Sequence, residues 1–399
     1  MAALFSGSKS GSVSLLLHIG SGSIGGLLVQ NFEDRPPLIL YTARESIVLR
    51  KRADHGKEYT MMKNSLDRVI ERVLGGVGTK TIHISKLSSI VCILSSPWYV
   101  SQTKIISLEH KQPITISNDF IDTITDKEIE SFKKDINKNN SNGDEVNNNI
   151  LIESHIIHIK LNGYPVKKPF GKKASIIEIA MIMSFAPQGI IKVVEEASKK
   201  LSHVGKVDFH TFSLAGFTVI RDIFPDIENF IFTEIGGEVT DVAIVKKGVL
   251  LETISLPLGS YTLVRSISES LNVLPDIALS YLSMDTDDAI HQELKANITS
   301  AKENARETWL KAFGNALSVL SEEIFLPREL FLISEQGTGD FFLALIKNSE
   351  FKNIAITGGS AHTTLLSGRT LSDFMVYEAG VPRDSFLSLI TLFHKRVIL

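Results

Sequence analysis

Glycine, serine and acidic residues gather at two places far apart in the sequence, and both places have the composition of a phosphate-binding turn. Residues 18–25 read HIGSGSIG and residues 234–241 read EIGGEVTD, each between two runs of strand-forming residues. Glycine lets backbone N–H groups converge on one point without obstruction by a Cβ atom, which creates a concave site for an anion. Two such hairpins facing one another would hold the phosphates of one nucleotide, although either hairpin alone is also a common tight turn.

The first glycine segment also matches the letters of a dinucleotide-binding fingerprint, but its surroundings exclude that site. GSGSIG at residues 20–25 fits G-x-G-x-x-G, a pattern whose last glycine must open a helix that faces the pyrophosphate. The next residues, GLLVQ, are a short strand-like run, and Pro36 and Pro37 follow soon after. The sequence also lacks the P-loop pattern G-x-x-x-x-G-K-[ST]. We therefore expect a strand, a tight turn and a strand at both places.

These residues give the chain a resemblance to the actin-like ATPase superfamily, and within it to the FtsA and PilM proteins of bacterial cell division and pilus assembly. EIGGEVTDVAIV is similar to the second phosphate loop of that superfamily, and HIGSGSIGGLLV is similar to the first. The resemblance implies that ATP is bound with Mg²⁺. The residues implied in ATP binding are Gly20, Ser21, Gly22, Ser23, Gly236, Gly237, Thr240, Asp241 and Gly259.

The superfamily also has a glycine loop that lies against the adenosine, after a strand and before a helix. FLISEQGTGDFF, with Gly337 and Gly339, has the expected elements around it. ITGGSAHTT, with Gly358 and Gly359, is closer to the family pattern in letters. We prefer the first segment on topology and keep the second as the alternative.

Three positions depart from the superfamily pattern, and all three concern acids used in hydrolysis. His18 stands where hydrolysing members have an aspartate, and Glu234 replaces the aspartate of the second loop. Residues 212–215 read FSLA where FtsA has Glu-Pro-x-Ala. His18 and Glu234 are thus the candidate catalytic positions, and Glu234 is the candidate Mg²⁺ residue through a water, since Mg²⁺ keeps waters held by carboxylates. We expect hydrolysis to be weakened more than nucleotide binding.

The order of strand and helix patterns occurs twice, which together with the resemblance predicts a duplicated α/β fold of the actin-like, ribonuclease H-like type. We expect a first subdomain at 12–106 and 187–224. A change to a short amphipathic helix and an Asn-rich polar tract indicates an inserted α+β subdomain at 107–186, which the resemblance implies is partner-binding. The second domain is expected at 225–399, with a helical subdomain at 262–325.

The bulk composition excludes several function classes. The chain has 399 residues, of which 43% are hydrophobic and 22% charged, with a formal net charge of -3. No broad basic surface is indicated, so we expect no nucleic acid partner. The single cysteine, Cys92, lies in an apolar run, which argues against a reactive thiol and favours a reducing compartment. We expect a cytoplasmic protein that is peripheral at the inner face of the membrane and contacts the membrane only indirectly.

Three further segments could be given a functional role, but a structural explanation is simpler for each. His155 and His158, three residues apart on a predicted strand, are expected to point to opposite faces and so to bind no metal together. KKPFGKK at 167–173 is expected to be a solvated basic loop of the inserted subdomain. The C-terminal segment SFLSLITLFHKRVIL is expected to be a core-packed helix rather than a membrane anchor.

These observations favour an ATP-binding actin-like scaffold in which the nucleotide sets domain closure. We expect it to recruit a protein partner of the division or pilus machinery, with self-association as a further option. The alternatives are an active ATPase or a small-molecule phosphotransferase on the same fold, and a module that has lost nucleotide binding. A phosphotransferase needs a carboxylate base beside the acceptor hydroxyl, and the sequence identifies none.

Overall fold

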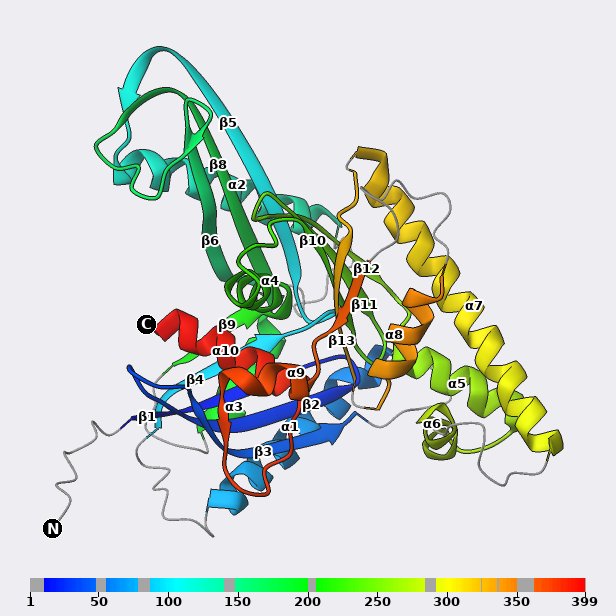
Figure 1. Ribbon diagram of the computed structural model, residues 1–399. Helices are drawn as coiled ribbons and strands as arrows, with labels where there is room; N and C mark the ends of the chain where they lie inside the picture. Colours follow the sequence, from blue (N-terminus) through cyan, green and yellow to red (C-terminus); the bar gives the residue numbers. More distant parts are fainter. Residues whose placement is uncertain are drawn as a thin grey trace, which may run out of the picture.

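Two mixed sheets form the body of the protein, and a third forms a separate subdomain (Figure 1). The computed structural model describes residues 11–47, 55–77, 87–139, 148–199, 206–283, 292–323, 325–335, 337–349 and 362–398. The strands of the first sheet are β1 (Ser12–Ile19), β2 (Ser23–Asn31), β3 (Leu38–Ser46), β4 (Leu87–Leu94), β9 (Val207–Thr211) and β15 (Val376–Tyr377). Those of the second are β10 (Phe230–Ile235), β11 (Thr240–Lys246), β12 (Val249–Leu256), β13 (Glu329–Ser334) and β14 (His362–Leu365).

The two body sheets have the same topology. Their strand orders are β15-β3-β2-β1-β4-β9 and β12-β11-β10-β13-β14. In each, three consecutive strands pair antiparallel, and the first of the three then pairs parallel with a later strand, β1 with β4 and β10 with β13. The predicted duplication is therefore confirmed. Strand β15, from near the C-terminus, adds to the outer edge of the first sheet.

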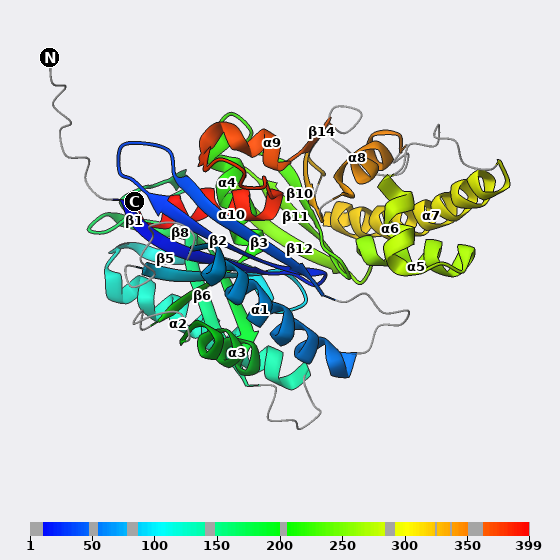
Figure 2. The ribbon, with the colours of Figure 1, turned by 90° about the horizontal axis from the view of Figure 1, so that it is seen from below.

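Helices cover both faces of the first sheet, as Figure 2 shows. Helices α1 (His55–Val77) and α3 (Gln188–Lys199) pack on one face. Helix α1 does so because Met62, Leu66, Val69 and Val73 recur at helical spacing and are all buried. Helices α4 (Phe212–Ile223) and α10 (Ser385–Ile398) lie on the other face, in one hydrophobic core shared with the second sheet. This shared core joins the two domains.

The second sheet carries four further helices on its outer face. These are α5 (Ser260–Leu271), α6 (Pro275–Ser283), α7 (Gln292–Glu323) and α8 (Gly339–Lys347). They pack around Trp309 and Phe313 of α7 and Phe342 of α8, all fully buried. A short helix α9 (Gly368–Leu371) precedes β15.

The inserted subdomain protrudes from the first domain and has its own sheet and core (Figure 1). Its elements are β5 (Val100–Thr115), α2 (Asn118–Asn139), β6 (Asn149–Leu161), β7 (Tyr164–Pro165) and β8 (Lys173–Pro187). The sheet order is β5-β8-β6-β7. Strand β5 pairs with β8 from Val100 onward, so this sheet begins before the expected boundary at residue 107.

The expectation that His155 and His158 point to opposite faces was wrong, because β6 contains a bulge between them. His155 pairs with Ile182 of β8, and His158 pairs with Ala180, two residues along the same strand. Residues two apart on a strand share a face, so both histidines lie on one face. The extra residue in β6 shifts the alternation by one position.

The C-terminal helix α10 packs into the shared core, as predicted, with Phe386, Leu389, Ile390 and Phe393 buried. Among the described residues, no helix has both the length and the apolar character needed to span a membrane.

Candidate functional site

The two glycine segments form the turns of equivalent hairpins. The first turn, residues 20–22, joins β1 to β2, and the N–H of Gly20 donates to the carbonyl oxygen of Ser23 at 3.0 Å. The second turn, residues 236–239, joins β10 to β11, and the N–H of Gly236 donates to the carbonyl oxygen of Val239 at 2.9 Å. Each is thus a strand, a tight turn and a strand, as the sequence predicted.

The two turns meet backbone against backbone. A Cβ atom added to Gly237 would lie 2.3 Å from the Cα of Gly22, and one added to Gly22 would lie 2.6 Å from the Cα of Gly237. The contact also has a hydrogen bond, because the N–H of Glu238 donates to Ser21 Oγ at 3.0 Å. The structure therefore brings the predicted residues together, with no space for another group between Gly22 and Gly237.

The start of α5 packs onto the second turn. A Cβ on Gly259 would lie 2.3 Å from the carbonyl oxygen of Gly237 and 2.5 Å from that of Gly236, so a side chain at position 259 would clash with backbone. The N–H of Ser260 donates to Gly236 O at 2.9 Å. The first N–H groups of a helix are the ones that bind anions. In α5, the first of these N–H groups already donates to a protein oxygen, the carbonyl of Gly236.

Tyr261 links this helix to both turns. Its N–H donates to the carbonyl oxygen of Gly237 at 2.8 Å, and its hydroxyl donates to the carbonyl oxygen of Gly22 at 2.7 Å. One side chain of the second domain thereby holds the first turn in place.

A buried carboxylate, Glu335, lies against the first turn. It follows β13, and Ser23 Oγ donates to its two carboxylate oxygens at 2.9 and 3.1 Å. Its Oε1 lies 3.1 Å from the position of a Cβ on Gly22. Gly337, at φ 85°, and Gly339, at the start of α8, belong to the same segment. The segment preferred as the adenosine loop thus directs an acid at the first turn.

An ion pair extends this contact to the C-terminal segment. Arg44 of β3 donates to Ser23 Oγ at 2.7 Å and pairs with Asp384 through Nε at 2.5 Å and Nη2 at 2.9 Å. Burial alone would raise the pKa of Asp384, but the adjacent Arg44 guanidinium holds that pKa below its usual value. Burial raises the pKa of Glu335, although Arg44 and the Ser23 hydroxyl partly offset this.

His18 is a core residue. It is 1% exposed, its Nε2 lies 2.9 Å from Ser95 Oγ, and its ring stacks on Phe386 with centroids 4.7 Å apart. Phe212 also packs against the His18 ring, with centroids 5.2 Å apart, and lies 5.1 Å from Phe386. Burial, with the nearby Arg44 charge, holds the pKa of His18 well below its usual value. The lowered pKa favours the neutral imidazole, which packs against two aromatic rings.

The acids of the second hairpin are buried opposite one another. Glu234 and Asp241 are paired across β10 and β11 and are 3% and 4% exposed. Burial, and then the proximity of Asp241, raises the pKa of Glu234 well above its usual value. Burial also raises the pKa of Asp241, which accepts a hydrogen bond from Ser255 Oγ at 2.5 Å. Among the described residues, Glu234 Oε2 has no hydrogen-bond partner, and the raised pKa favours protonation of this carboxyl in the metal-free protein.

The residues present do not fit a triphosphate in this arrangement. If the phosphates of one nucleotide lay between the two turns, they would meet the contact of Gly22 with Gly237 and the Glu335 carboxylate bound to Ser23. The Glu335 carboxylate beside the first turn is an anionic group that the protein itself supplies at this place. The roles predicted for the two turns in ATP binding therefore stay predictions, and so does the Mg²⁺ role of Glu234.

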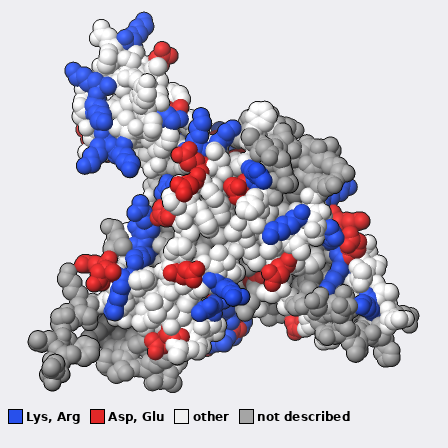
Figure 3. All heavy atoms as spheres, viewed as in Figure 1, with Lys and Arg blue, Asp and Glu red and all other residues white. Residues whose placement is uncertain are grey.

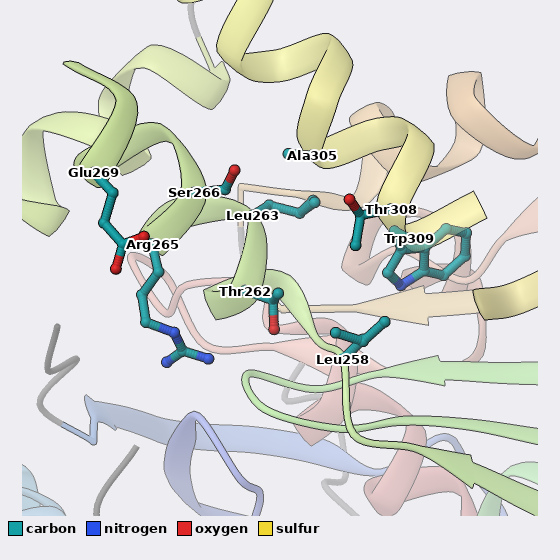
Figure 4. A pocket seen from close by; sticks show the side chains of 9 residues that line it. All are labelled: Leu258, Thr262, Leu263, Arg265, Ser266, Glu269, Ala305, Thr308 and Trp309. Atoms are coloured by element: carbon teal, nitrogen blue, oxygen red, sulfur yellow. The ribbon is translucent and has the colours of Figure 1, made fainter. Parts of the chain in front are cut away.

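A cavity of about 320 Å³ lies beside the second turn, between α5 and α7 (Figure 4). Arg265 of α5 lines it and pairs with Glu238 of the turn at 2.5 and 2.7 Å. Thr308 and Trp309 line it from α7, and the indole N–H of Trp309 donates to Thr240 Oγ1 at 3.4 Å. Thr240 itself donates to the carbonyl oxygen of Leu258 at 2.6 Å.

Sequence reasoning missed Arg44, Tyr261, Glu335 and Asp384. For Glu335 a signal existed, because it is an acid inside a glycine loop. The other three carried none, since their partners come from other elements. The alternative adenosine loop with Gly358 and Gly359 lies outside the described residues.

Comparison with known proteins supports one assignment, which concerns the fold. No family model matches the chain, and no curated protein matches it. A solved structure of a PilM–PilN type IV pilus biogenesis complex is similar over 96% of this chain and 98% of that one, with 12% identity and a TM-score of 0.62. The chain has the actin-like fold.

Two further solved structures also match over most of their length, with lower scores. The ethanolamine utilization protein EutJ from Carboxydothermus hydrogenoformans is 11% identical over 98% of this chain and 91% of that one, with a TM-score of 0.44. A protein of actin-like ATPase fold from Bacteroides thetaiotaomicron is 10% identical over 96% of each chain, with a TM-score of 0.39.

Proposed function

We propose that this actin-like protein is a scaffold whose two domains are held closed by its own side chains and backbone, without a nucleotide, and which presents its inserted subdomain to a protein partner. The observation that carries the proposal is the direct contact of Gly22 with Gly237, with the Glu335 carboxylate beside it.

Entry of a nucleotide between the turns would break several contacts at once. The bonds lost would be those from Ser23 to Glu335, from Glu238 to Ser21 and from Tyr261 to Gly22. Each is worth about 0.5–1.5 kcal/mol, and about 1.5–3 kcal/mol where a charged group takes part. The phosphates would also meet the Glu335 carboxylate in a buried place, where repulsion between like charges is strong. Closure by protein groups is therefore favoured over closure by ATP.

The outer end of the inserted subdomain has the character of a docking surface. Lys167, Lys168, Lys172 and Lys173 are exposed there, and Figure 3 shows Lys and Arg gathered on this protruding part. Two aromatic side chains are exposed on the same segment, Tyr164 at 75% and Phe170 at 55%. Exposed aromatic groups with basic neighbours suit a protein segment that carries acidic and apolar residues.

We assign the partner to a pilus system rather than to cell division. The solved structure that shares this fold at a TM-score of 0.62 is a complex of PilM with PilN, in type IV pilus biogenesis. A gene neighbourhood that encodes pilus inner-membrane proteins would support this assignment. A neighbouring gene for a tubulin-like division protein would favour the division role instead.

A thermal unfolding assay tests the nucleotide-independent closure. The purified chain is heated with and without ATP and MgCl₂ at millimolar concentration, and released phosphate is measured in parallel. A ligand at about 100 times its Kd adds about 2.7 kcal/mol of stability, which is a shift of several degrees. We expect no shift in Tm and no phosphate above background. A reproducible rise in Tm with ATP would contradict the proposal.

The cavity between α5 and α7 supports a second candidate, a nucleotide-gated scaffold. Its volume of about 320 Å³ is at the lower end of small-molecule sites, and Arg265 connects it to the second turn. If the protein is a nucleotide-gated scaffold, ATP should raise the Tm. The variant Thr308→Trp, which fills the cavity from α7, should then abolish that rise. Exposed Thr299, on the same helix but outside the cavity lining, offers the control Thr299→Trp.

A further inference from the structure

We propose that Glu153, His155 and His210 form a binding site for a divalent transition metal, with Zn²⁺ the best match. Their ligand atoms, one from each residue, all lie within 4.8 Å of one another, the one such group found among the described residues. Glu153 and His155 belong to β6 of the inserted subdomain and His210 to β9, the edge strand of the first sheet. The site therefore lies where the inserted subdomain meets the first domain.

Strand geometry explains how two ligands come from β6. Glu153 pairs with Ser184 of β8, and His155 pairs with Ile182. Since Ser184 and Ile182 are two residues apart, Glu153 and His155 point to the same face. His210 faces them across the junction, with its ring 6.0 Å from that of His155 and inclined by 25°.

The carboxylate is held in position by hydrogen bonds from Ser184 and Thr211. Ser184 Oγ donates to Glu153 Oε1 at 2.9 Å, the Thr211 hydroxyl donates to the same oxygen, and the N–H of Thr211 lies 3.3 Å from both carboxylate oxygens. Such partners orient metal-binding carboxylates and histidines in known sites. The Glu153 side chain is fully buried, whereas His155 is exposed, which leaves a path for an ion from solvent.

The spacing of the ligand atoms suits a tetrahedral ion. Glu153 Oε2 and His210 Nδ1 are 3.3 Å apart. Two ligands bound at about 2.0–2.1 Å to a tetrahedral Zn²⁺ lie about 3.3 Å from each other. Two imidazoles and one carboxylate are a ligand set that binds Zn²⁺ and leaves a fourth position open.

A second observation points to a ligand beside His210. His394 of α10 is 2% exposed, and its Nε2 is buried without a hydrogen-bond partner. It lines a cavity of about 50 Å³ together with His210 and Asp208. An unsatisfied buried nitrogen next to a His and Glu cluster is what a bound ion or its water would satisfy. A metal here would join β6 to β9 and fix the inserted subdomain on the body.

Zinc titration of the full chain tests the site. The protein is stripped with chelator, dialysed and titrated with ZnSO₄ by calorimetry, with Tm measured at each ratio. We expect saturable binding of one Zn²⁺ per chain, weakened at least tenfold in His155→Ala and in His210→Ala. The matched control is His158→Ala, on the same strand and face but outside the cluster, and it should bind as the wild type does.

The readouts are separable from a folding defect, because His155 is exposed and its replacement should leave the Tm of the metal-free protein unchanged. The proposal is overturned if no saturable binding is found. It is equally overturned if His155→Ala and His210→Ala bind Zn²⁺ as tightly as the wild type. In that case the Glu153–His210 contact is a hydrogen bond and nothing more.

Discussion

Gly22 and Gly237, which lie 215 positions apart in the chain, pack so closely that neither tolerates a Cβ atom without movement of the other's backbone. They come from equivalent turns of the two duplicated domains, so their contact is the point at which the domains close.

Gly237→Ala should therefore destabilise the protein. The added methyl would meet the Cα of Gly22 at 2.3 Å, and overpacking of this kind costs about 1–3 kcal/mol. Urea unfolding followed by circular dichroism measures the change. Gly314→Ala is the control, since nothing lies within 4 Å of a Cβ there and the position is inside α7. That variant should be neutral or more stable by up to about 1 kcal/mol. Equal stability of Gly237→Ala and wild type would show that the turns are apart in solution.

The Arg44–Asp384 pair should contribute strongly because both partners are buried, with side chains 13% and 10% exposed. Arg44→Met would leave the Asp384 carboxylate without its cation and would also remove the donor to Ser23. Loss of one partner of a buried pair costs about 3–5 kcal/mol. Chemical denaturation of Arg44→Met measures this.

An exposed ion pair offers the matched control for Arg44→Met. Arg396 and Asp222 are 63% and 38% exposed, and exposed pairs contribute about 0–1 kcal/mol. Arg396→Ala should thus change stability little. Similar losses in the two variants would contradict the structural role assigned to the buried pair.

Glu234 should make the protein less stable as pH rises. Its folded-state pKa is raised well above the usual 4.5 by burial and by Asp241. The folded state therefore binds the proton more tightly than the unfolded state. The contribution to stability is complete below pH 4.5 and is lost as pH rises toward the folded-state pKa. Each unit of this shift corresponds to about 1.4 kcal/mol.

Glu234→Gln cannot ionise, so its Tm should exceed that of the wild type at pH 8 by more than it does at pH 5. Melting curves at a series of pH values measure the difference. The control is Glu252→Gln, whose side chain is exposed on β12, and it should not change the pH profile. A difference between Glu234→Gln and wild type that is constant with pH would rule out a raised pKa.

The sequence predicted the repeated architecture because that architecture depends on local patterns. Alternating strands, glycine turns and one amphipathic helix face are each encoded within a few residues, and the two hairpins follow directly from them. The same local patterns could not predict which residues contact one another across the two domains. Ser23 and Glu335 are 312 positions apart, and Arg44 and Asp384 are 340 apart, so their contacts exist only after the fold has formed.

The error at His155 and His158 has a similar physical origin. Alternation along β6 places the two on opposite faces only if every residue pairs with β8, and the bulge adds one residue that does not. A bulge is decided by pairing with the neighbouring strand and leaves no mark in the alternation itself. The grouping of His155 with His210 likewise depends on the junction of β6 and β9, which residue spacing cannot indicate.

Hydrogen exchange of the nucleotide-free protein tests the central claim most directly. The N–H of Glu238 in the second domain bonds to Ser21 Oγ of the first, so peptides that cover residues 235–240 report on the closed contact. The account predicts slow exchange in these peptides without ATP and no change when ATP and Mg²⁺ are added. Fast exchange without ATP, with protection on its addition, would show that a nucleotide closes the domains and would contradict the account.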